Sequence, residues 1–89
     1  MPRYLVMRTL PSLDAEQLEA IGAKVVAACE QVDGMQWIKS HVSADGTRSF
    51  CEFIAPNPDA CRRHAQLAGL PLDDVIPLGA DMGPLAKAG

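Results

Sequence analysis

Two helix-start signals divide this chain into short β-rich runs, and their order restricts the fold more than any other feature. Asp14 begins one helix, with Gln17 as its capping-box partner. Asn57 followed by Pro58 begins the other, because asparagine is a favoured N-cap and proline suits the first helical turn. Runs rich in β-branched and aromatic residues surround these helices, at about 3–9, 35–43, 48–55 and 75–78.

The resulting order is strand, helix, strand, strand, helix, strand, which is the pattern of the ferredoxin-like β-α-β-β-α-β fold. Right-handed crossovers then place both helices on one face of a four-stranded antiparallel sheet. The opposite face has no helix to cover it. A chain of 89 residues has no room for a second core. We therefore predict an α+β protein with residues 1–78 as a ferredoxin-like domain and 79–89 as a C-terminal tail.

The Asp45–Gly46 pair predicts how the two central runs pair, because it is a strong signal for a two-residue type I′ hairpin turn. Counting back from this turn predicts the pairs Val42–Ser49, His41–Phe50, Ser40–Cys51, Lys39–Glu52, Ile38–Phe53 and Trp37–Ile54. Side chains alternate between the two faces of a strand. The helix side is expected to hold Ile38, Ser40, Val42, Cys51, Phe53 and Ala55, together with Leu5 and Met7 of the first strand. The open face is expected to hold Trp37, Lys39, His41, Phe50, Glu52 and Ile54, together with Tyr4, Val6 and Arg8.

Many of the side chains assigned to the open face are large and apolar. Soluble monomers rarely leave such a patch in water. We therefore predict a homodimer in which two open sheet faces meet, forming a dimeric α+β barrel. The ionisable side chains of the same face would then line a cavity between or beside the two sheets.

Four residues of this face form a candidate ligand site: Arg8, Trp37, His41 and Glu52. In it His41 serves as acid or base, Glu52 as its partner and Arg8 as an anchor for a small anionic ligand. The same His41 and Glu52 could instead bind a divalent metal ion. A purely structural network is the other interpretation, with Lys39 paired to Glu52 across the strands. The sequence leaves open whether the protein is an enzyme.

A second candidate site lies on the predicted second helix. Cys61 and His64 are three residues apart on one helical face, which is a workable metal half-site. That face also packs on the core, where a cysteine usually acts as a small hydrophobic residue. Cys51 is expected to be a buried thiol, although a shift of one residue in register would bring it beside His41.

Composition excludes several classes of protein. A net charge of −3 makes binding to a nucleic-acid backbone unfavourable. No apolar run approaches the roughly 20 residues that a membrane span requires. Three cysteines without a close C-x-x-C pair fit reduced thiols better than disulfides, so we expect a cytoplasmic protein that binds neither nucleic acid nor membrane.

Four motifs together resemble a bacterial family of small ferredoxin-like proteins, a domain of unknown function that includes a nickel-binding protein from an actinobacterium. They are M-P-R-Y-L-V-x-R (1–8), W-I-K-S-H-V-S-A-D-G (37–46), F-C-x-F-x-A-P (50–56) and H-A-x-x-A-G-L-P (64–71).

The resemblance implies a dimeric α+β barrel and binding of nickel or another divalent transition metal. The resemblance implies binding through histidine and cysteine side chains, and with Glu52 from the open face the candidate metal ligands are His41, Cys51, Glu52 and His64. The chain departs from the family pattern at Arg8, where the nickel-binding members carry a histidine. On the resemblance we consider a metal-binding protein first, a ligand-binding or enzymatic α+β barrel second, and an interaction module without small-molecule chemistry third.

Overall fold

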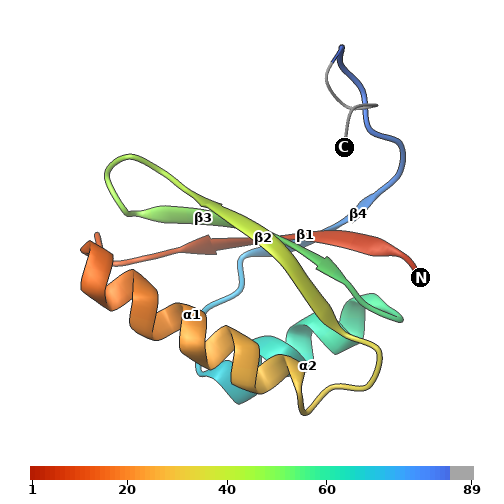
Figure 1. Ribbon diagram of the computed structural model, residues 1–89, viewed down its shortest axis with the longest axis horizontal. Coiled ribbons are helices and arrows are strands. Elements are labelled where there is room, and N and C mark those ends of the chain that lie inside the picture. Colours follow the sequence, from red (N-terminus) through yellow and green to blue (C-terminus); the bar gives the residue numbers. More distant parts are fainter. Residues whose placement is uncertain (85–89) are drawn as a thin grey trace.

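The computed structural model describes residues 1–84 and has the predicted order of elements. These are β1 (Arg3–Thr9), α1 (Ala15–Cys29), β2 (Gln36–Val42), β3 (Arg48–Ile54), α2 (Pro58–Ala68) and β4 (Asp74–Leu78). The strands form one antiparallel sheet in the order β2-β3-β1-β4, and both helices lie on the same side of it (Figure 1). The predicted ferredoxin-like α+β fold is confirmed.

The two helices begin where the capping residues predict. The Asp14 carboxylate accepts a hydrogen bond from the Gln17 backbone N–H at 2.8 Å, and the Gln17 side chain accepts one from the Asp14 N–H at 3.0 Å. The Asn57 side chain accepts a hydrogen bond from the Ala60 N–H at 2.9 Å, and Gly69 ends α2 in the left-handed conformation. Within residues 1–84 neither helix has the length and apolar character needed to cross a membrane.

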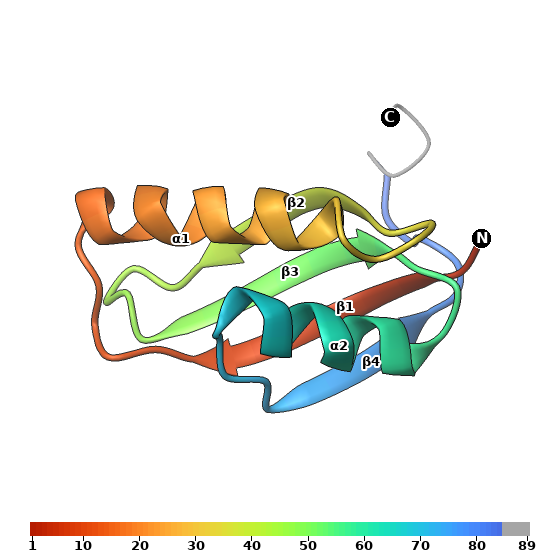
Figure 2. The ribbon, with the colours of Figure 1, turned by 90° about the horizontal axis from the view of Figure 1, so that it is seen from below.

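Each helix covers a different part of the sheet. Figure 2 shows α1 running along the β2 side and α2 lying over β1 and β4. The space between the two layers is filled by a core of small and medium-sized side chains around Val6, Phe53 and Cys61, all three of which are fully buried. The opposite face of the sheet carries no helix.

The pairing of β2 with β3 largely follows the prediction. The predicted pairs Lys39–Glu52, Ser40–Cys51, His41–Phe50 and Val42–Ser49 are all present. The predicted type I′ turn is not, because Gly46 has a φ of +72° whereas Asp45 stays at negative φ. Instead the Asp45 carboxylate closes a wider loop by accepting hydrogen bonds from the Ser43 hydroxyl at 2.7 Å and the Thr47 N–H at 3.0 Å.

The face assigned to β1 was wrong. Tyr4, Val6 and Arg8 are buried beneath the helices, whereas Leu5 and Met7 lie on the open face. The β1–β3 pairing fixes this, because Val6 is opposite the buried Cys51. Both alternations of this strand contain apolar side chains, so hydrophobic pattern alone does not choose between them.

The position of Trp37 was also wrong, and a β-bulge is the reason. Trp37 pairs with Phe53 and Lys39 pairs with Glu52, so Ile38 is an extra residue without a partner. The inserted residue reverses the alternation of everything before it in β2. Trp37 therefore packs against the core beneath α1, and Ile38, predicted to lie inside, is 44% exposed.

Candidate functional site

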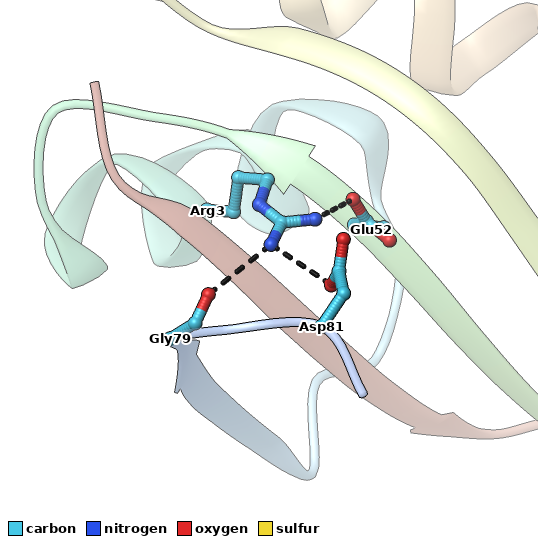
Figure 3. Close-up of polar contacts among 4 residues, drawn as sticks. All are labelled: Arg3, Glu52, Gly79 and Asp81. Atoms are coloured by element: carbon cyan, nitrogen blue, oxygen red, sulfur yellow. Dashed lines mark hydrogen bonds and ion pairs between the residues drawn. The ribbon is translucent and has the colours of Figure 1, made fainter. Parts of the chain in front are cut away.

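An arginine at the start of β1 binds three oxygen atoms on the open face (Figure 3). Arg3 Nη1 donates to Glu52 Oε2 at 3.1 Å, and Arg3 Nη2 donates to the Gly79 carbonyl at 3.2 Å and to Asp81 Oδ1 at 3.0 Å. Asp81 is the largest cause, and Glu52 the next, of the raised pKa of Arg3. These contacts join β1 and β3 to the predicted C-terminal tail. Residues 79–84 of that tail are described, and 85–89 lie outside the described residues.

Sequence reasoning missed Arg3. The assignment of Leu5 and Met7 to the core implied that Arg3, which alternates with them, also pointed inward. The correct alternation places all three on the open face, with Arg3 next to Glu52. The usable signal was Glu52 itself, since a carboxylate on an open sheet face favours a cationic neighbour on the adjacent strand.

His41 and Glu52 share the open face, as predicted, but the Glu52 carboxylate is already occupied. His41 lies on the edge strand β2, opposite Phe50 and exposed to solvent. Lys39 is opposite Glu52, yet the ion pair of Glu52 is with Arg3. Within residues 1–84 no hydrogen bond joins His41 to Glu52, so one subunit does not contain the predicted acid–base pair.

The sheet separates the four predicted metal ligands into two pairs. His41 and Glu52 lie on the open face, whereas Cys51 and His64 are buried on the helix side. Over the described part of the chain, no three His, Cys, Asp or Glu side chains are grouped so that they could hold a metal ion. A single subunit therefore does not fit a closed metal centre.

His64 has a structural position. Its ring is fully buried on α2, 4.9 Å from the Phe53 ring between centroids, and Nε2 is 3.0 Å from the Val25 carbonyl, to which it donates as the neutral tautomer. Burial lowers the pKa of His64, and the nearby Arg8 charge lowers it further. Burial also raises the pKa of the Cys61 thiol one turn earlier. These two groups are therefore neutral core residues.

Arg8 and Trp37, predicted to line a cavity on the open face, line a cavity on the helix side instead. Its volume is about 190 Å³, and it lies between α1 and the sheet. Most of its lining is apolar: Leu10, Leu18, Ile21, Gly22, Val25, Val42 and Leu70. The other lining residues are Arg8, Trp37, Ser40, Ser49 and Cys51.

Arg8 is the charged residue in the lining of this cavity. Arg8 is only 2% exposed, and Nη1 donates to the Pro71 carbonyl at 2.7 Å. Its Nε and Nη2 atoms are buried and have no hydrogen-bond partner among the described residues. Over residues 1–84 no carboxylate forms an ion pair with it. A buried cation with free donors is costly, so such a group is unusual in a site that serves only packing.

The fold and these two sites define a small ferredoxin-like α+β domain with an open sheet face and a cavity under one helix. The chain belongs to the family described as nickel responsive protein SCO4226-like, whose model matches residues 4–78. Its structure is similar to that of SCO4226 from Streptomyces coelicolor A3(2), with a TM-score of 0.76 and 16% sequence identity over 88% of this chain and 99% of that chain. No curated protein sequence matches the chain.

Proposed function

We propose that this protein responds to nickel by binding the ion as a homodimer, at a site shared between two open sheet faces. The observation that carries the proposal is the exposed imidazole of His41 on an open face, in a chain that belongs to a nickel responsive family. Imidazole is a suitable ligand for nickel. Binding and release of the ion, without catalysis, is the function proposed.

The need for a second subunit follows from the ligand count. The chain has two histidines, and His64 is buried with Nε2 engaged by the Val25 carbonyl. His41 is then the imidazole left to bind a metal ion. One imidazole is too few for a stable site, and a symmetric dimer doubles the number because the same surface patch faces itself across the axis.

The open face has the composition of a contact surface. Leu5, Met7, Phe50 and Ile54 are half-buried there, and Ile76 on the neighbouring strand is 37% exposed. The register groups them, since Met7 is opposite Phe50 and Leu5 is opposite Ile76. An apolar patch with charged neighbours is typical of a protein interface.

Of the residues after β4, those described (79–84) contact only one end of this surface. Gly79 and Asp81 bind Arg3, which lies at the first residue of β1. Met7 lies toward the other end of the strand, opposite Phe50, which in turn is opposite His41. In the proposed dimer Met7 and Phe50, the part of the apolar surface away from Arg3, therefore lie at the same end of the sheet as His41.

Calorimetric titration of the untagged, chelator-treated protein with NiCl₂, together with its mass in solution by light scattering, tests the proposal. We expect nickel binding and a dimeric mass. His41→Ala is expected to lose nickel binding while keeping its fold by circular dichroism. Lys39→Ala, on the same strand and face, is the matched control and is expected to bind like the parent protein. Absence of nickel binding, or binding retained in His41→Ala, would contradict the proposal.

A further inference from the structure

The cavity under α1 combines an apolar wall with one buried cation, and this combination has no role in the proposed metal response. The cavity and the open face lie on opposite sides of the sheet, so its residues are separate from His41. Arg8 supplies the charge, and half-buried or buried side chains from α1, β2 and β3 supply the walls. We propose that this cavity binds a small apolar carboxylate, with Arg8 as the anchor of its carboxylate group.

The free atoms of Arg8 select a carboxylate. Nη1 is used by the Pro71 carbonyl, which leaves Nε and Nη2. These two nitrogens form one edge of the planar guanidinium, and their N–H groups point in parallel. A carboxylate accepts two parallel hydrogen bonds from such an edge, with a geometry that a single acceptor cannot match.

Within residues 1–84 no acidic side chain compensates the charge of Arg8. Two buried groups that feel this charge are His64 and Cys61, and both are neutral in the fold. Nε and Nη2 are themselves buried, so a carboxylate entering from the cavity would displace the side chains packed against them. It would then supply the missing counter-charge and accept from both donors together.

The rest of the cavity restricts the ligand to a compact apolar body. Its volume of about 190 Å³ compares with the ~150 Å³ of a cavity that holds one benzene molecule. Beyond Arg8, the polar atoms of the lining belong to Ser40, Ser49, Cys51 and the indole N–H of Trp37, which already donates to the Ser40 hydroxyl at 2.8 Å. A phosphate or sulfate would leave several of its oxygens against apolar walls, which favours a carboxylate on one small ring or branched alkyl group.

The exposure of the lining residues favours entry beside the edge strand. Val25 and Ala28 are the buried residues of α1, and both lie in its C-terminal half. Leu18, nearer the start of the helix, is half-buried, and Val42 on β2 is 40% exposed. We therefore expect a ligand to enter between the N-terminal half of α1 and β2.

The single tryptophan of the chain reports directly on this cavity, because Trp37 is one of its walls. We would titrate the chelator-treated protein with sodium cyclohexanecarboxylate and follow Trp37 emission. The expected result is a saturable change that is absent with cyclohexanecarboxamide, which lacks the charge, and with acetate, which lacks the apolar body. Equal responses to the amide or to acetate, or no saturable response, would overturn the proposal.

Variants assign the binding to Arg8. Arg8→Met is expected to lose the response, and Arg8→Lys, which keeps the charge without the paired donors, is expected to weaken binding at least tenfold. Arg63→Met, an exposed arginine on α2, is the control and should bind normally. Amide shifts in ¹H–¹⁵N spectra should centre on Gly22 and Val25. Shifts centred on Arg3 instead, or unchanged binding in Arg8→Met, would overturn the proposal, whereas loss of nickel binding in His41→Ala leaves it intact.

Discussion

Replacing Arg8 by methionine should stabilise the ligand-free protein. The side chain is 2% exposed, makes one hydrogen bond, to the Pro71 carbonyl, and leaves Nε and Nη2 without partners. Methionine fills a similar volume and removes the buried charge. Its cost is the lost hydrogen bond, and Pro71 is exposed, so water can take the place of the guanidinium at that carbonyl.

The expected size follows from two opposing contributions. Replacing a buried ion pair or triad by apolar residues of similar volume is often neutral or stabilising by about 1–4 kcal/mol. Arg8→Met also loses a hydrogen bond from a charged group, which contributes about 1.5–3 kcal/mol, but water can replace the guanidinium at the exposed Pro71 carbonyl. We therefore expect a net gain at the lower end of that range, about 1–2 kcal/mol. For a domain of 89 residues each kcal/mol raises Tm by about 4–8 °C.

Urea unfolding and calorimetry of Arg8→Met, with Arg63→Met as the control, would measure this gain. The exposed Arg63 has no ion pair within the described residues, so its replacement should change the free energy of unfolding by no more than about 0.5 kcal/mol. If Arg8→Met instead lowered the free energy of unfolding by about 2 kcal/mol or more, the prediction would be wrong, because the charge of the guanidinium would then be balanced by a partner in solution.

Three further predictions follow from individual residues. Burial lowers the pKa of His64 in the folded protein, so the contribution of its neutral ring to stability is complete above pH 6.5 and is lost as pH falls through the folded-state pKa. Calorimetry should therefore show that Tm declines less from pH 7 to 5 in His64→Leu than in the parent protein. Hydrogen bonds, first of all from the Thr47 hydroxyl, lower the pKa of Asp45 to about 2. Asp45→Asn should therefore lower Tm at pH 7, and the difference in Tm from the parent protein should vanish as pH falls from about 4 to 2. An unchanged difference in Tm at pH 2 would show that the Asp45 carboxylate does not stabilise the loop. Gly22 lies within α1 at ordinary helical φ, and a Cβ added there would meet the Trp37 Cη2 atom at 3.7 Å, an ordinary contact distance. Gly22→Ala should therefore raise the free energy of unfolding by about 0.5–1 kcal/mol. A fall in the free energy of unfolding would indicate that the helix must move when Cβ is added.

The parts of the fold that the sequence predicts are those with local causes. The capping residues Asp14 and Asn57 fix where the helices begin, because their side chains bond to backbone only three residues away. Four of the pairs between β2 and β3 follow from a short loop that limits how the strands can meet. The order of these elements is then enough to define the ferredoxin-like fold.

The incorrect predictions have tertiary causes. The bulge at Ile38 moves Trp37 to the helix side, and no turn or propensity signal marks it. Which side chains of β1 face the helices depends on the pairing of β1 with β3, which lies about 45 residues further along the chain. Arg8 was assigned to the open face with Tyr4 and Val6 by the same alternation, and buried arginines without an ionic partner are too rare to be predicted from residue type. The predicted ligand site therefore combined residues from two faces of the sheet. Arg8 and Trp37 lie on the helix side, whereas His41 and Glu52 lie on the open face.

Native mass spectrometry of the untagged protein, with and without added NiCl₂, would show which oligomeric state carries nickel. We expect nickel on the dimer and none on the monomer, and we expect His41→Ala to remove nickel from the spectrum. A monomer that binds nickel stoichiometrically, or a protein that stays monomeric and free of metal at saturating NiCl₂, would contradict the proposed function.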